Sequence, residues 1–260
     1  MGNKKSKKSQ ITIFVIIAMI IVISIAVAFI VIKKPFSGIS AMEDPQVYIA
    51  KCVSNSLSEA EETMLIGNGY VNVTDNFILF SLNKPKEKVP YLCQSSEFYK
   101  PCINQEPMFA GHVKKEIYDI IKPDVDKCFN DLINILKKAS YEIEEANSSI
   151  LEIEFNKYFI IANMKRNLVL KKGDETRVFT NFEAKINSPL YNLIDTSEKI
   201  VNYESTLCEF DTINWMNMNR DISIRKFVTG DQTKVYTIKD VDTSKQINIA
   251  VRTCVLPAGI

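Results

Sequence analysis

One stretch of the chain is apolar without interruption, whereas the rest changes between helical and strand-like periods. Residues 11–32 carry no charge, and their only polar side chains are Thr12 and Ser24. In a helix at about 1.5 Å per residue, this stretch spans roughly 33 Å, enough to cross a hydrocarbon core of about 30 Å. Because backbone polar groups must be satisfied within lipid, the pattern predicts a transmembrane helix over residues 11–32.

A cleaved secretory signal is the main alternative for this stretch. Such a signal has an apolar region of about 7–15 residues, followed closely by a small-x-small cleavage site. Here the apolar run is longer and ends at Lys33–Lys34–Pro35, a flank typical of stop-transfer segments. The small residues at Gly38–Ser40 lie well beyond the run. The sequence therefore favours an anchor over a discarded signal.

The lysines that flank the apolar run predict its orientation. Two lysines follow the run, and four precede it: Lys4, Lys5, Lys7 and Lys8. The positive-inside tendency then places the N-terminus in the cytoplasm and the body outside. We expect a basic cytoplasmic leader at residues 1–10 and a short tether at residues 33–43.

The first half of the body has mainly helical periodicity. Asp44 and Pro45 suit an N-cap and a first helical position, and apolar residues recur at three- and four-residue steps as far as Met64. A second apolar stripe runs from Val113 to about residue 140, and Pro123 is expected to kink or interrupt it. Residues 70–73 and 77–82 are strand-like, and 83–93 is predicted to be a loop.

From residue 150 the pattern changes to strands. Strand-like runs at 150–155, 158–164, 167–172 and 176–186 are followed by a helix starting near Ser188–Pro189 and by three more strands at 220–228, 234–241 and 246–256. Residues 150–257 are therefore predicted to follow the order β-β-β-α-β-β-β. Short connections favour antiparallel pairing. The predicted fold class is α+β: a single N-terminal transmembrane helix, a helical, cysteine-containing half (44–148), and an antiparallel β meander with one inserted helix (149–260).

Charge separates the leader from the body. The first 34 residues carry six lysines and no acid, so the other 226 residues hold 26 Lys and Arg against 31 Asp and Glu, a net charge of −5. A nucleic-acid-binding protein would need a basic patch on its folded part. The balance argues against a nucleic-acid partner.

All six cysteines follow the apolar run, which suggests three disulfides in an oxidising compartment. Cys93 and Cys102 bracket a short loop, so a local bridge fits them. Cys52 and Cys128 each lie on an apolar helical stripe and could join two helices, which leaves Cys208 and Cys254. Free core cysteines in a cytoplasmic body are the alternative. A Cys/His zinc site is disfavoured, because no CxxC occurs and His112 is the only histidine.

The sequence contains no recognisable catalytic constellation. His112 lies near the start of the second helix with no nucleophile motif beside it, and Glu142, Glu144 and Glu145 fit a solvated face. Trp215 is the one contact residue that we would probe. No catalytic, cofactor-binding or metal-binding residue and no cofactor is predicted. Asn72 and Asn147 match the N-glycosylation sequon.

The start of the chain, with "KKSQITIF" before the apolar helix, resembles the class III signal sequence of archaeal type IV pilin-like proteins. The resemblance implies cleavage between Ser9 and Gln10 by a prepilin peptidase on the cytoplasmic side. The chain departs from the pattern at Phe14, where many pilins have Glu, and at Ser9, where Gly or Ala is more usual.

The body, through segments such as "YIAKCVSNSLSEAEETMLIGNGYV", resembles single-pass membrane proteins of small-genome archaea, a family from which no activity carries over. Together these observations predict a non-enzymatic, membrane-anchored surface protein with a structural or adhesive role, or a pilin-like subunit. Its expected partners are membrane lipid, a prepilin peptidase, and further copies of itself or other surface proteins. A tethered ligand- or peptide-binding module is the alternative, followed by an envelope enzyme.

Overall fold

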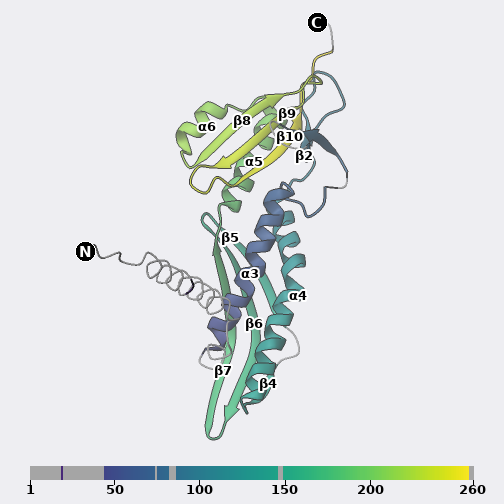
Figure 1. The fold of residues 1–260 in the computed structure, drawn as a ribbon. Helices are drawn as coiled ribbons and strands as arrows, with labels where there is room; N and C mark the ends of the chain where they lie inside the picture. Colours follow the sequence, from purple (N-terminus) through teal and green to yellow (C-terminus); the bar gives the residue numbers. More distant parts are fainter. Residues whose placement is uncertain (1–18, 20–43, 74, 82–85, 146–148, 258–260) are drawn as a thin grey trace, which may run out of the picture.

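The computed structural model describes residues 19, 44–73, 75–81, 86–145 and 149–257. These residues form an elongated body with a long lower lobe and a smaller upper lobe (Figure 1). The predictions for Ser9, Gln10, the tether at 33–43 and Asn147 lie outside the described residues, as does the membrane helix at 11–32 apart from residue 19. No helix within the described ranges is both long and apolar enough to cross a membrane.

Helix α3 (Pro45–Ile66) begins where its sequence signals placed it. The Asp44 carboxylate accepts hydrogen bonds from the backbone N–H groups of the first turn, and Pro45 occupies the first helical position. The apolar stripe is buried. After the helix the chain turns through Gly69, whose φ is +92° and where a Cβ atom would lie 2.4 Å from the Phe109 ring. Glycine therefore permits both the turn and the close approach of the next helix.

Helix α4 (Phe109–Lys138) is continuous, so the predicted interruption at Pro123 was wrong. Pro123 lies on the exposed side of the helix. The backbone carbonyl that loses its usual partner is therefore accessible to water, which lowers the cost of proline there. Ten buried residues in α4 pack toward α3 and the lower sheet.

The lower lobe is built on a long antiparallel sheet. Its central strand is β6 (Phe159–Lys172), which pairs along one side with β7 (Glu175–Asn187). Along its other side lie, end to end, β5 (Ile150–Asn156) and β4 (Glu142–Glu145). The two strand-like runs at 158–164 and 167–172 form one strand, so three strands lie between residue 150 and the next helix, as the predicted order requires. The strand keeps its pairing across an irregularity between Lys165 and Leu168. Helices α3 and α4 cover one face of this sheet (Figure 1).

The upper lobe is a second sheet with two helices. Its strand order is β1 (Phe77–Phe80), β2 (Glu87–Gln94), β10 (Gln246–Arg252), β9 (Lys234–Asp240) and β8 (Ile222–Val228), with the short β3 (Ile103–Asn104) also beside β2. Helix α5 (Leu190–Leu207) was predicted, whereas α6 (Thr212–Met218) was not.

The upper sheet corrects two expectations. The segment expected as a loop at 83–93 is a strand from Glu87 onward, because β2 runs from Glu87 to Gln94. Strand β2 pairs with β10 in parallel, so the strands are not a simple antiparallel meander. The upper sheet therefore combines β1, β2 and β3, which precede residue 148, with β8, β9 and β10, which follow residue 149. The two lobes also share one hydrophobic core, which runs from Ile49 in α3 to Val251 in β10. The coarse α+β class with mostly antiparallel strands is confirmed.

Candidate functional site

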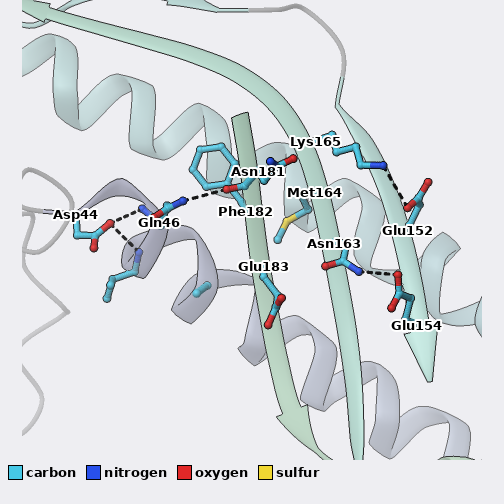
Figure 2. A pocket seen from close by; sticks show the side chains of 12 residues that line it. Asp44, Gln46, Glu152, Glu154, Asn163, Met164, Lys165, Asn181, Phe182 and Glu183 are labelled. Carbon is cyan, nitrogen blue, oxygen red and sulfur yellow. Dashed lines mark hydrogen bonds and ion pairs between the residues drawn. The ribbon is translucent and has the colours of Figure 1, made fainter. Parts of the chain in front are cut away.

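A hollow of ≈ 600 Å³ opens beside the start of α3, and we call it the α3 hollow (Figure 2). The first turns of α3 form one wall, and strands β5, β6 and β7 form the other. Its lining residues are Asp44, Gln46, Val47, Ala50, Glu152, Glu154, Asn163, Met164, Lys165, Asn181, Phe182 and Glu183. Eight of these twelve residues are polar or charged, and four are apolar. Met164 and Phe182 pair on the buried face of the sheet, whereas Asn163 and Glu183 pair on the opposite, exposed face.

Local hydrogen bonds fix the two walls of the α3 hollow to one another. Asp44 Oδ1 accepts from the backbone N–H groups of Gln46 at 2.9 Å and Val47 at 3.3 Å. The Gln46 side-chain amide in turn donates to the backbone carbonyl of Asn181 at 3.1 Å. Because Asn181 lies in β7, this bond ties the start of the helix to the strand at the edge of the sheet.

The α3 hollow is acidic. Four carboxylates line it against a single lysine, Lys165, which lies 3.7 Å from Glu152. The Glu154 carboxylate accepts a hydrogen bond from the Asn163 amide at 2.9 Å. These groups can attract a cationic or hydrogen-bond-donating group of a ligand. Among the residues that the structure describes, no group of three or more His, Cys, Asp or Glu side chains is placed to hold a metal ion.

Removing the N-cap of α3 is expected to weaken the fold modestly. Asp44→Ala deletes the acceptor for two orphan N–H groups, so the free energy of unfolding should fall by about 1 kcal/mol. Chemical denaturation of the full chain in detergent measures this change. Asp174→Ala, at the exposed β6–β7 turn, is the matched control and should change stability by less than about 0.5 kcal/mol. Equal effects of the two substitutions would contradict the capping role.

A second hollow of ≈ 600 Å³ lies where α3 meets the upper sheet, and it is organised around a buried acid. Glu61 is 4% exposed, and its carboxylate pairs with Lys245 Nζ at 2.8 Å. The Ser188 hydroxyl donates to the same carboxylate at 2.6 Å. Three segments far apart in sequence therefore converge on Glu61, which joins the lower lobe to the upper one.

The side-chain amides of Asn68 and Asn248 form further hydrogen bonds beside the Glu61 cluster. The buried Asn68 side chain accepts from the backbone N–H of Asn248 at 2.6 Å and donates to the Lys88 carbonyl at 3.2 Å. The Asn248 side-chain amide donates to Glu87 at 2.8 Å. Because these polar groups are hydrogen-bonded to one another, the cost of removing them from water is offset. Their main role is to align the two lobes.

Among the residues that the structure describes, the most deeply buried charged side chain is Glu204 of α5, which is fully buried. Lys234 Nζ lies 2.8 Å from Glu204 Oε2 and also donates to the Cys208 carbonyl at 2.6 Å. The Tyr236 hydroxyl donates to Glu204. Burial, and then the neighbouring Glu204 carboxylate, raise the pKa of Tyr236 above its usual range, so this phenol stays protonated as a donor. The contacts of Glu204 with Lys234 and Tyr236 thus hold α5 against β9.

The six cysteines are all paired, in the combinations that the stripes and the loop suggested. Cys52 joins Cys128 across α3 and α4, with a Cα–Cα distance of 6.0 Å. Cys93 joins Cys102 across 5.4 Å, and Cys208 joins Cys254 across 5.8 Å. Each distance lies within the range that a disulfide can bridge. The bonds thus close the helical pair, a loop in the upper lobe, and the end of α5 against the last strand.

The other residues that the sequence singled out lie apart from both hollows. His112 is half-buried in the first turn of α4, where its ring centroid is 4.5 Å from that of Tyr70. Trp215 of α6 packs against Phe210 with ring centroids 5.7 Å apart. Asn72 is exposed, as a glycosylation acceptor must be.

The acidic run expected on a solvated face forms β4. Glu142, Glu144 and Glu145 are all exposed, as predicted. The Glu144 carboxylate pairs with Lys171 at 2.6 Å, and the Glu145 carboxylate pairs with Arg166 at 2.6 Å, so two of these acids form ion pairs with the neighbouring strand β6.

Sequence reasoning missed the acids that matter most to the architecture. Glu204 falls four residues after Ile200 on the apolar stripe of α5, and a charge on such a stripe is a detectable sign of a buried pair. Glu61 likewise follows Leu57 by four residues on the stripe of α3. Their partners Lys234 and Lys245 carried no comparable local signal.

Comparison with known proteins supplies no family: no protein-family model, no curated protein and no solved structure matches the chain.

Proposed function

We propose that the chain is a membrane-anchored extracytoplasmic surface protein, non-enzymatic and structural or adhesive in role. In this proposal residues 11–32 are a single transmembrane helix, residues 1–10 lie in the cytoplasm, and the described body stands outside. The archaeal, pilin-like resemblance of residues 4–32 adds a specific form: a prepilin peptidase cuts between Ser9 and Gln10, and the subunit associates with copies of itself or with other surface proteins.

The observation that carries this proposal is the pairing of all six cysteines. Disulfides persist in oxidising compartments and are rare in the cytoplasm. The bonds are spread over both lobes, which supports an entire body outside the membrane. The chain enters this body at α3, shortly after the apolar run, and the elongated shape suits a protein that holds its upper lobe away from the membrane (Figure 1).

A second candidate is a tethered binding module, and the α3 hollow favours it. The four carboxylates among its lining residues suit a ligand or peptide that carries an amine or guanidinium group. The anchored location is common to both candidates. They differ in whether Glu152 and Glu154, which are among the residues that line the hollow, are needed for the biological role.

N-terminal sequencing and thiol mapping of the protein from its own membrane test the proposal. We expect three intramolecular disulfides, no thiol open to alkylation before reduction, and a chain that begins at Met1 or Gly2, or at Gln10 if it is processed as a prepilin. Six reactive thiols in the unreduced protein would contradict the proposed extracytoplasmic location of the body. A start near Ala41 would show that the apolar run is a discarded signal.

A further inference from the structure

The lower end of the body is formed by two segments that lie side by side, and we call it the foot. It consists of the last turn of α4 with β4 (residues 137–145) and the β6–β7 turn with its flanking strand ends (residues 166–178). Strand β4 pairs with β6 here, and Lys172 Nζ lies 4.7 Å from the centre of the Tyr141 ring. In the foot, the end of helix α4 and the end of the lower sheet are therefore in contact. The upper lobe lies at the opposite end of the body (Figure 1).

The foot extends beyond the point at which the chain enters the body. Helix α3 begins level with Asn181, to which Gln46 is hydrogen-bonded, and it runs away from the foot (Figure 1). From Asn181 to Glu175, the start of β7, the strand covers about 20 Å at 3.3 Å per residue. The 30 residues of α4 also exceed the 22 of α3, by about 12 Å of helix. The entry point therefore lies above the foot.

The length of chain before α3 limits how far the foot can be from the membrane. This step rests on the proposed function, in which the membrane helix ends at Ile32. Residues 33–43 span at most about 38 Å when fully extended. When the body stands upright, about 20 Å of this reach is used to pass the foot. The foot then lies within about 18 Å of the end of the membrane helix.

Charge distinguishes the foot from the rest of the lower lobe. It has six Lys and Arg residues against five Asp and Glu, whereas the remainder of the lower lobe (44–66, 109–136 and 149–165, 179–187) has eight against twelve. Two of the foot's cations pair internally, Lys171 with Glu144 and Arg166 with Glu145. Lys137 and Lys138, in the last turn of α4, are exposed.

From this position and charge, we propose that the foot rests on the membrane surface and that its lysines contact anionic lipid headgroups. Lysine side chains have long apolar stems that allow the ammonium group to reach headgroups, and basic segments next to a membrane are drawn to anionic lipid. The upright stance, from which the limit of about 18 Å was obtained, is part of this proposal, and it places the upper lobe farthest from the membrane.

Fluorescence quenching in nanodiscs tests this contact with the full chain. The only native tryptophan, Trp215, lies in the upper lobe and is the internal control. In a Trp215→Phe background, Asp174→Trp places an indole at the exposed β6–β7 turn. In discs of phosphatidylcholine and phosphatidylglycerol with brominated chains, we expect at least twofold more quenching at position 174 than at Trp215 in the otherwise native chain. Glu175→Trp is a second reporter if the first variant fails to fold.

A matched pair of charge reversals tests the headgroup contact. Lys137→Glu with Lys138→Glu should at least halve the quenching at position 174 in anionic discs. Lys114→Glu with Lys115→Glu makes the same change near the other end of α4 and should leave the quenching unchanged. If both pairs behave alike, the lysine–headgroup contact is refuted.

The same preparation separates this inference from the proposed function. Co-elution of the chain with the discs, together with equal quenching at positions 174 and 215, would overturn the foot contact and leave the anchor intact. A chain that does not co-elute with the discs would overturn the anchor, and the foot contact with it.

Discussion

Lys234→Met is expected to lower the free energy of unfolding by about 3–5 kcal/mol, because it leaves the buried Glu204 carboxylate without its cation. Glu204 is completely buried, and the Lys234 side chain is 13% exposed, so water cannot replace the lost ammonium. Within the described part of the chain, only the Tyr236 hydroxyl then remains as a side-chain donor to that carboxylate. Chemical denaturation of the full chain in detergent, followed by the fluorescence of Trp215, measures the loss.

Two further variants distinguish a buried charge from a general loss of packing. Adding Glu204→Gln to Lys234→Met removes the unpaired charge while keeping an acceptor for Tyr236, so part of the stability should return. Lys226→Met breaks a pair with Glu209, which is 59% exposed, and should cost less than about 1 kcal/mol. The interpretation fails if Lys234→Met is no more costly than Lys226→Met.

The elements that sequence predicted well are those whose signals are local. Helices α3 and α5 carry an apolar stripe and a recognisable start within one short segment, and both form as expected. The stripes also placed Cys52 and Cys128 on facing helix surfaces, and the structure pairs them. Local periodicity was therefore sufficient to predict these helices and the disulfide between Cys52 and Cys128.

The elements that sequence missed depend on distant partners. Strand β2 contains Pro90 and follows Lys84–Pro85–Lys86, so its local signal is that of a loop. In the structure β2 pairs with the nearby strands β1 and β3 and also with β10, where Tyr91 and Cys93 meet residues from the far end of the chain. Periodicity within one segment carries no information about such a partner, and a parallel pair requires a long connection.

The candidate site was missed for the same reason. The α3 hollow combines Asp44, which sequence identified as an N-cap, with Glu152 and Glu154 from a strand about 110 residues away. Nothing in the alternating pattern of that strand marks its exposed acids as neighbours of a helix start. The hollow exists only once the helix pair lies on the sheet.

The disulfide between α3 and α4 is expected to contribute more stability than the disulfide that closes the loop. Cys52 and Cys128 are separated by 76 positions, whereas Cys93 and Cys102 are separated by 9. The chain-entropy treatment gives about 4.5 kcal/mol for the first bond and about 2.6 kcal/mol for the second. Replacing each pair by alanine should therefore produce losses that differ by about 2 kcal/mol, measured by denaturation of the oxidised full chain.

The comparison of the two alanine pairs controls for the loss of sulfur atoms from the interior, since both remove the same groups. When all disulfides are reduced, most of the difference in stability between the two alanine variants should disappear, because no disulfide then restricts the unfolded chain. A loop variant, Cys93→Ala with Cys102→Ala, that loses as much stability as the helix variant would contradict this account. It would mean that the loop is fixed mainly through packing in the upper lobe, where Cys93 is fully buried, and that chain entropy is not what makes the helix bond important.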